Sequence, residues 1–361
     1  MLKVANLRNY LCRLYGREVN ILSIGGLTDL KEKDELKGFG YGSPILIEFE
    51  MDGQRKRAVL ETMKAEGFGH DHFSDRACSL LLAHSTYNKL PKHISSLDVG
   101  AFTRTGSLIS LGEAVEFFLL DEYIEGKEYF HDLERIKEQE TISEEDVMRA
   151  QVLSDYLVEI HTLKKDDLQL YTRRIRDLVG HGECIMGLID SYPRDWHFVA
   201  EDFFQKVEVK CIEWRWRIKD KGYRLSQVHG DFHPWNVLFK SGLDFWVLDR
   251  SRGEWGEPAD DFTAMSINYI FYSLQKYGEL KEPFRNLFLK FVQNYLEKTG
   301  DEEIFLVCQP FYAWRGLVIA SPIWYPNLAD DVRKKLFNFI INVLDVEKFD
   351  IHNVNSYFEP S

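Results

Sequence analysis

The chain has 361 residues, of which 45% are hydrophobic and 14% aromatic, and it carries a formal net charge of −13. This composition excludes a disordered chain, and the length predicts two domains or one enzyme of two lobes. The negative charge and the absence of a long lysine and arginine run argue against nucleic acid as a partner. The five cysteines are widely spaced and form no CxxC pair, which favours a reducing cytoplasm. We expect neither a signal peptide nor a membrane anchor.

Apolar spacing predicts a small sheet with helices in the first 123 residues. The expected elements are, in chain order, a helix over 4–14, strands over 19–24, 45–49 and 57–63, a helix over 74–89 and a strand over 117–120. Asp52 and Gly53 supply the tight turn of a hairpin between the second and third strands. This part of the chain therefore predicts an antiparallel sheet.

Beyond about residue 126 the pattern becomes mainly helical. Helices are expected over 144–161, 196–217, 259–277, 283–298 and 329–344. The exception is SQVHGDFHPWNVLFKSGLDFWVLD, residues 226–249, which predicts two short strands around loops. The fold class expected is α+β, with an N-terminal sheet lobe with a helix over residues 1–123 and a larger, mainly helical lobe over 124–361.

The segment VHGDFHPWNVLF, residues 228–239, combines polar groups with a turn-rich loop between apolar stretches. Asn236 lies five residues after Asp231, and Asp249 lies thirteen residues after Asn236, at the end of an apolar strand. Phosphoryl transfer needs a carboxylate that orients the attacking hydroxyl and accepts its proton, and oxygen ligands for Mg²⁺. Asp231 suits the first role, and Asn236 with Asp249 suits the second. The alternative is that all three residues serve as turn, cap and strand-end residues.

HGDFHPWN resembles the HGDxHxxN catalytic loop of the aminoglycoside phosphotransferase and choline kinase family, which itself matches the HRDxxxxN loop of protein kinases. LDRSRG and GEPADDF are similar to the family's metal-binding segment and to the segment after it. SDYLVEIHTL and FFLLDEYIEG are similar to its helix ending in histidine and to its hinge. The resemblance covers about residues 18–280. It implies a protein-kinase-like bilobal fold and transfer of the γ-phosphate of ATP or GTP to a hydroxyl of a small molecule.

The resemblance also implies roles for residues around the catalytic loop. Asp231 is the expected base, and Asp261 is expected to anchor the loop. We place His233 at the catalytic centre with Asp231. His229 and His233 are expected to orient the loop by hydrogen bonds, because the carboxylate already provides the base.

The nucleotide site is expected in the N-terminal lobe and the hinge. The run KGFGYG contains Gly38, Gly40 and Gly42, whose backbone could approach phosphates as a glycine-rich loop does. The alternative is that these glycines only end a loop before a strand. The hinge resemblance implies that Glu122 and Tyr123 hold the purine.

One position departs from the family pattern. The strand AVLETMK carries Glu61 where the family has the lysine that grips the nucleotide phosphates, and SDRACSL carries Arg76 where the family has its glutamate partner. We expect a reversed ion pair between Glu61 and Arg76, with Arg76 facing the nucleotide. Two alternatives stay open: Lys64 folds back, or both residues are solvated.

Candidate acceptor contacts lie in the helical lobe. Arg173 and Arg176 share one helical face, and Arg315 lies among aromatic residues. The alternative is that the charges are solvated and the aromatic residues form core. The sequence does not name the acceptor or the oligomeric state. A silent nucleotide-binding scaffold and a nucleotidyl transferase with inverted nucleotide placement are the alternative functions.

Overall fold

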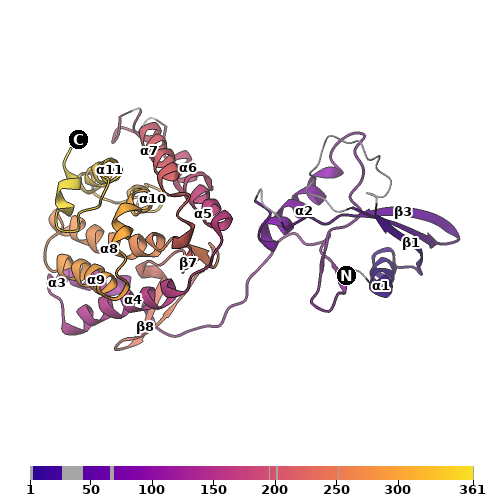
Figure 1. The fold of residues 1–361 in the computed structure, drawn as a ribbon, viewed down its shortest axis with the longest axis horizontal. Helices are drawn as coiled ribbons and strands as arrows, with labels where there is room; N and C mark the ends of the chain where they lie inside the picture. Colours follow the sequence, from indigo (N-terminus) through magenta and orange to yellow (C-terminus); the bar gives the residue numbers. More distant parts are fainter. Residues whose placement is uncertain are drawn as a thin grey trace. The chain divides into compact units, whose positions relative to one another are not determined.

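The computed structural model describes residues 3–26, 44–65, 69–194, 196–200, 202–250 and 252–360. It forms two compact units, Met1–Asp121 and Glu122–Ser361. The predicted α+β class is confirmed, because the first unit contains a small antiparallel sheet and the second is mainly helical (Figure 1). The predicted lobe boundary after residue 123 lies close to this division.

The sheet of the N-terminal unit has three antiparallel strands in the order β1–β2–β3. Its elements are α1 (Val4–Tyr15), β1 (Asn20–Gly26), β2 (Ile45–Met51) and β3 (Gln54–Leu60). Asp52 and Gly53 both have positive φ, 53° and 73°, as the tightest hairpin turns require. Leu7 of α1 and Phe49 of β2 belong to one small buried core.

The rest of this unit comprises α2 (Phe73–Tyr87) and a hairpin of β4 (Gly100–Phe102) and β5 (Leu108–Ser110). The prediction of a strand over 117–120 is wrong. That segment has no regular structure, and Phe118, Leu119 and Leu120 are exposed. A short apolar run becomes a strand only where a neighbouring strand pairs with it, and none of the described strands does so here.

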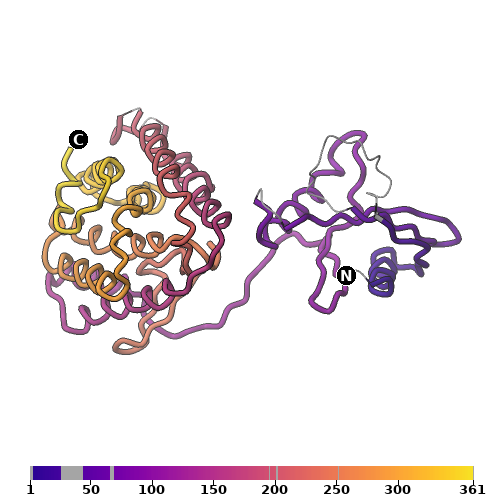
Figure 2. Tube along the Cα trace, viewed as in Figure 1, coloured from indigo at the N-terminus to yellow at the C-terminus, as the bar shows by residue number. Residues whose placement is uncertain are grey.

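Helices of the C-terminal unit gather around α8, whose residues 259–274 are almost all buried (Figures 1 and 2). The helices are α3 (Phe130–Gln139), α4 (Glu144–Thr162), α5 (Leu168–Gly180), α6 (Ile185–Asp190), α7 (Phe203–Ile218), α8 (Ala259–Tyr277), α9 (Phe284–Thr299), α10 (Gln309–Ala320) and α11 (Asp330–Asp345). Four predicted helices, α4, α8, α9 and α11, are confirmed. Among the described helices, none is both long enough and apolar enough to cross a membrane.

The predicted helix over 196–217 begins later, at Phe203. The preceding aromatic residues lie in an irregular segment, where Trp196 packs against Phe198 and Phe337 with ring centroids 4.9 and 5.6 Å apart. This clustering of large rings explains the later start of the helix, because it satisfies the apolar surface without helical spacing.

Two small sheets lie in the same unit. The first joins β6 (Lys127–Glu128), β8 (Val237–Ser241) and β9 (Asp244–Val247), and the second pairs β7 (Ser226–Gln227) with β10 (Trp255–Gly256). In the β8–β9 hairpin Val237 pairs with Val247. The residues just before β8 and just after β9 therefore lie at the same end of the hairpin.

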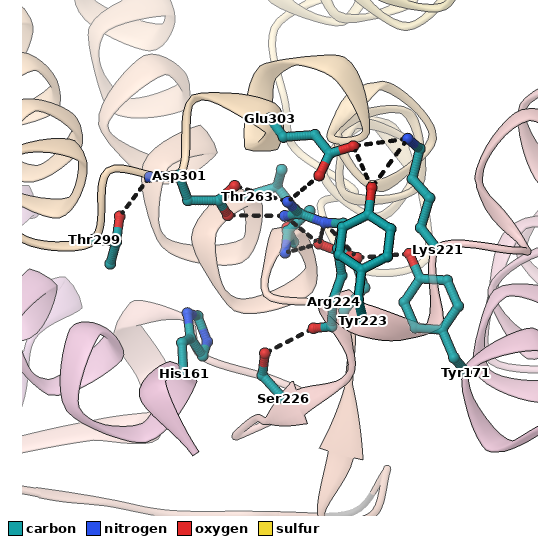
Figure 3. Close-up of polar contacts among 12 residues, drawn as sticks. His161, Tyr171, Lys221, Tyr223, Arg224, Ser226, Thr263, Thr299, Asp301 and Glu303 are labelled. Carbon is teal, nitrogen blue, oxygen red and sulfur yellow. Dashed lines mark hydrogen bonds and ion pairs between the residues drawn. The ribbon is translucent and has the colours of Figure 1, made fainter. Parts of the chain in front are cut away.

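Arg224 holds together several segments next to β7 (Figure 3). It ends the short 3₁₀ turn η2 (Gly222–Arg224) and is buried. Its guanidinium lies 2.7 Å from carboxylate oxygens of both Glu257 and Asp301 and 3.2 Å from Glu303. Asp301 and Glu303 lie at the start of η4 (Glu302–Leu306). The buried cation is thus matched by carboxylates from sequence-distant segments, as a buried charge requires.

Candidate active site

The loop between β7 and β8 carries the predicted catalytic residues, and its shape depends on Gly230. This glycine has a φ of +88°, which side chains of L-residues rarely allow. A Cβ added there would lie 3.2 Å from the Cβ of Arg252. Gly230 therefore permits both the turn before Asp231 and the close approach of Arg252.

Asp261, in the first turn of α8, anchors this loop. Its two carboxylate oxygens accept hydrogen bonds of 2.7 Å from the backbone N–H groups of His229 and Gly230. His161 Nε2 lies 3.2 Å from the same carboxylate, and His161 Nδ1 lies 2.9 Å from the Tyr295 hydroxyl. Burial alone would raise the pKa of Asp261, but the hydrogen bonds from His161 and the backbone outweigh burial and lower it. The predicted anchoring by Asp261 is confirmed.

Asp231 is held by two arginines. Its Oδ1 accepts hydrogen bonds from Arg315 Nη1 at 2.6 Å and Arg252 Nη1 at 2.9 Å, and its Oδ2 lies 3.5 Å from His233 Nε2. Burial opposes ionisation, but these three cationic or donor groups outweigh it and lower the pKa of Asp231 well below its usual range. The carboxylate is therefore ionised at neutral pH. Both arginines bind Oδ1, whereas the contact of Oδ2 with His233 is longer, so Oδ2 is the oxygen more open to another donor.

Asn236 and Asp249 lie together at one end of the β8–β9 hairpin. The backbone oxygen of Asn236 accepts a hydrogen bond of 2.9 Å from Leu248 N. Asp249 follows Leu248 in the chain and therefore lies close to Asn236. Asn236 Nδ2 donates to the backbone oxygen of Asp231 at 3.0 Å, and within the described chain its Oδ1 has no hydrogen-bond donor. Asp249 is exposed, and its φ is +54°, a conformation uncommon outside glycine.

These two side chains fit a magnesium site. An amide oxygen and a carboxylate are hard oxygen ligands, and Mg²⁺ in nucleotide enzymes typically takes one or two such ligands and completes its shell with phosphates and water. The described residues contain no cluster of three or more histidine, cysteine, aspartate or glutamate side chains that could hold a metal. Two protein ligands leave the other positions around Mg²⁺ to phosphate oxygens and water.

Both histidines of the loop bind its backbone. His229 is buried, and its Nδ1 accepts from Asp231 N at 3.3 Å. Burial lowers the pKa of His229, which favours the neutral ring. His233 Nδ1 accepts from Trp235 N at 3.3 Å, at the start of the 3₁₀ turn η3 (Pro234–Asn236). These contacts orient the loop.

Arg315, predicted as an acceptor contact, lies at the centre of the site. It belongs to α10, it is buried, and its Nη2 donates to Asp260 Oδ1 at 2.6 Å. The guanidinium carbons of Arg315 and Arg252 lie 4.0 and 4.5 Å from the centroid of the Trp314 ring. Arg252, Asp260 and Trp314 were not predicted as site residues. The segments LDRSRG and GEPADDF contain the first two, but nothing in their pattern marks Arg252 as a contact of Asp231.

Arg173 and Arg176 lie on α5, and the structure does not bring them to Asp231. Arg173 Nε lies 3.3 Å from Asp177 Oδ2, and Arg176 Nη2 lies 3.5 Å from Asp177 Oδ1. Their role as acceptor contacts stays a prediction.

The expected ion pair between Glu61 and Arg76 is wrong. Arg76 Nη1 instead donates to the backbone oxygens of His70, Asp71 and His72 at 2.7, 3.1 and 3.0 Å, in the turn before α2. Glu61 is exposed and forms no ion pair with described residues. It borders a cavity of about 610 Å³ between α1, β3 and α2. Arg76 is bound locally, because three carbonyl oxygens within one turn accept from its Nη1.

The other predicted nucleotide contacts stay predictions. Gly38, Gly40 and Gly42 lie outside the described residues. Glu122 and Tyr123 lie in an irregular segment at the start of the C-terminal unit, and both are exposed.

Comparison with solved structures gives matches that span most of the chain. Ethanolamine kinase of Plasmodium vivax is 13% identical, covering 95% of this chain and 80% of its own, with a TM-score of 0.35. Amicoumacin kinase, solved with AMP-PNP and Ca²⁺, is 14% identical, with coverages of 90% and 92% and a TM-score of 0.43. A thermostable mutant of aminoglycoside phosphotransferase APH(4)-Ia is 17% identical, with coverages of 92% and 98% and a TM-score of 0.34.

By name, all three proteins transfer phosphate to small molecules, the class that the sequence motifs resemble. Each TM-score lies below 0.5. No family model and no curated protein matches the chain.

Proposed function

We propose that this protein is a small-molecule kinase that transfers the γ-phosphate of ATP or GTP to a hydroxyl group. The observation that carries the proposal is the arrangement around the catalytic loop. Asp261 binds the loop backbone through two hydrogen bonds, and Asn236 donates to the Asp231 backbone. Asp231, Asn236 and Asp249 thereby lie on one loop and one hairpin end, which is the set of groups that phosphoryl transfer uses.

In this proposal Asp231 orients the acceptor. The acceptor hydroxyl donates to Asp231 Oδ2, because Oδ1 is already occupied by Arg315 and Arg252. The hydroxyl oxygen then forms a bond to the γ-phosphorus while the bond from that phosphorus to the β,γ-bridging oxygen breaks, and the hydroxyl proton passes to Oδ2. A carboxylate with a lowered pKa is a weak base, so its main contribution is orientation. That suffices in a loose transition state, where the proton leaves late.

Asn236 and Asp249 would bind Mg²⁺ together with the nucleotide phosphates, and the metal would neutralise charge on those phosphates. We also propose that the N-terminal unit and the segment with Glu122 and Tyr123 contact the nucleotide. Glu61 occupies the position where related kinases carry a phosphate-binding lysine, so that contribution must come from another residue.

The direct test is to incubate the protein with Mg²⁺, either ATP or GTP, and a panel of hydroxylated metabolites. Nucleoside diphosphate release is followed, and acceptors are weighed by mass spectrometry. A gain of one phosphate group that depends on Asp231 supports the proposal. A gain of a nucleotidyl group would identify a nucleotidyl transferase. Nucleotide binding without any product across the panel would favour a silent scaffold.

A further inference from the structure

Three arginines and two aspartates meet around the catalytic carboxylate. Arg252 and Arg315 both donate to Asp231, and Arg315 also donates to Asp260. Arg174 of α5 is the third cation, because its Nη2 lies 3.3 Å from the position of a Cβ built on Gly253, the residue after Arg252. The cluster therefore contains one more cation than carboxylates.

Among the residues that the structure describes, the remaining nearby carboxylate does not balance this charge. Asp177, the other carboxylate that acts on Arg174, is already shared by Arg173 and Arg176. Asp260 is already paired with Arg315, whose Nη2 donates to Asp260 Oδ1 at 2.6 Å. Burial lowers the pKa of Arg174, and the nearby Asp260 and Asp177 do not fully offset this effect.

Several donors of the cluster are unused. Arg315 Nε and Arg252 Nε are buried and have no hydrogen-bond acceptor within the described part of the chain. The Arg315 side chain is only 7% exposed. Arg174 makes no hydrogen bond or ion pair with described residues. Since buried donors are normally satisfied, these groups indicate that an acceptor-rich ligand belongs here.

Resting on the kinase function proposed above, we propose that the substrate hydroxyl belongs to an anionic molecule, whose phosphate or carboxylate group is bound by Arg174 and Arg252 beside Asp231. A guanidinium group presents a planar fork of N–H donors that binds either oxyanion through two parallel hydrogen bonds. The Trp314 ring stacks with the Arg252 guanidinium and restricts its orientation.

A cationic acceptor fits this site poorly. Its amine would have to compete with Arg315 and Arg252 for the single Asp231 carboxylate and would lie next to three like charges. An anion meets the opposite situation, because its charge balances the excess cation and its oxygens accept from the unused donors.

The first experiment measures binding alone, without nucleotide or Mg²⁺. Glycerol 3-phosphate, glycerate and glycerol are titrated at constant ionic strength, since they share hydroxyl groups but carry a phosphate, a carboxylate or no charge. One or both anions should bind, and glycerol should not. Arg174→Ala and Arg252→Ala should each weaken anion binding about tenfold or more. Arg252→Lys should recover only part of the loss, because it restores the charge but not the fork.

Arg285→Ala is the matched control, because Arg285 is exposed on α9 and the charge change is the same. Circular dichroism and the Tm confirm that each variant is folded. Equal binding of the anions by wild type, Arg174→Ala and Arg252→Ala would overturn the proposal, as would wild type that binds neither anion.

The second experiment tests turnover with the same three compounds and with ethanolamine, in the presence of Mg²⁺ and nucleotide. Phosphorylation of the neutral or amine compound in preference to both anions would overturn the inference while the kinase function stands. Anion binding that depends on Arg174 and Arg252, without phosphate transfer to any acceptor, would contradict the kinase function while the anion site stands. Preference for glycerol 3-phosphate or for glycerate tells which anionic group the site takes.

Discussion

His161 and Asp261 are separated by 100 positions in the chain, yet His161 Nε2 lies 3.2 Å from the Asp261 carboxylate in the core of the C-terminal unit. The same carboxylate binds the backbone of the catalytic loop. Folding of the helical unit and the shape of the loop therefore depend on one buried charge.

Asp261→Asn should lower both stability and activity. The amide has one acceptor oxygen, so at least one of the two loop N–H groups loses its partner, at a cost of about 1–3 kcal/mol. Urea denaturation measures the loss, and Asp220→Asn, at an exposed position, is the control.

The effect of pH follows from the lowered pKa of Asp261. The ionised group stabilises the folded state at pH values above its ordinary pKa of 3.8, and this stabilisation is lost as the pH falls through the lower folded-state value. The stability gap between wild type and Asp261→Asn should therefore be large at pH 7 and should shrink below about pH 4. A gap that grows on acidification would contradict the assignment.

Asp231→Asn should reduce kcat by about 10²-fold or more, because the amide no longer accepts the hydroxyl proton or balances Arg315 and Arg252. The Kd for nucleotide should change little, since in the proposed function Asp231 contacts the acceptor and not the nucleotide. Steady-state kinetics and nucleotide titration decide the point. Asp244→Asn, the same change at an exposed hairpin residue, should leave both unaffected. Retained turnover in Asp231→Asn would remove Asp231 from the catalytic step.

Asp249→Ala should weaken nucleotide binding only in the presence of Mg²⁺, because it removes the charged side chain proposed as a metal ligand. Calorimetric titrations with Mg²⁺ and with EDTA provide the comparison within one variant. Asn236→Ala should act in the same direction, with an additional effect on the backbone of Asp231, to which Asn236 Nδ2 donates. Equal affinities of wild type and Asp249→Ala at saturating Mg²⁺ would be incompatible with a metal-binding role.

Glu303→Gln should make the free energy of unfolding depend less on pH in the acidic range. Burial raises the pKa of Glu303, but hydrogen bonds from Lys221 and Tyr223 and the charge of Arg224 outweigh it and lower the pKa from 4.5 to about 2. Its stabilisation is complete above pH 4.5 and is lost between pH 4.5 and 2. At pH 7 the variant should be less stable by about 1–3 kcal/mol. Glu302→Gln, at a highly exposed neighbour, should follow the wild-type curve.

Glu61→Ala and Arg76→Ala should have additive effects, because the two side chains do not pair. Arg76→Ala should destabilise the turn before α2, where its guanidinium binds three carbonyl oxygens. A double-mutant cycle on thermal stability gives the coupling, and independent sites add within about 0.5 kcal/mol. A larger coupling would restore the ion pair that the sequence suggested.

Sequence patterns predicted most of the helices and the antiparallel hairpins, because amphipathic spacing and the Asp52–Gly53 turn are local signals. The anchoring of the loop by Asp261 was also predictable, but from a family resemblance and not from local pattern. The contact of Arg315 and Arg252 with Asp231 could not be predicted from the sequence. This contact joins α10 to two loops, and the spacing of residues in the sequence does not predict tertiary contacts of this kind.

The same limit explains the two errors. Glu61 and Arg76 have complementary charges, but Arg76 donates to backbone carbonyl oxygens in the turn before α2. Such nearby carbonyl groups compete effectively with a distant carboxylate. The apolar run over 117–120 has strand composition, but composition does not supply a neighbouring strand.

The Arg224 cluster connects the segment with Asp301 and Glu303 to the strand that leads into the proposed catalytic loop. Asp301 and Glu303 lie well beyond the last catalytic motif, yet they balance the arginine that sits next to the strand leading into that motif. A fragment ending at residue 300 would keep the loop, the hairpin and Asp261, but it would leave Arg224 short of counter-charge and would lack Arg315. Truncation directly after the recognisable motifs would therefore remove residues on which the proposed site depends.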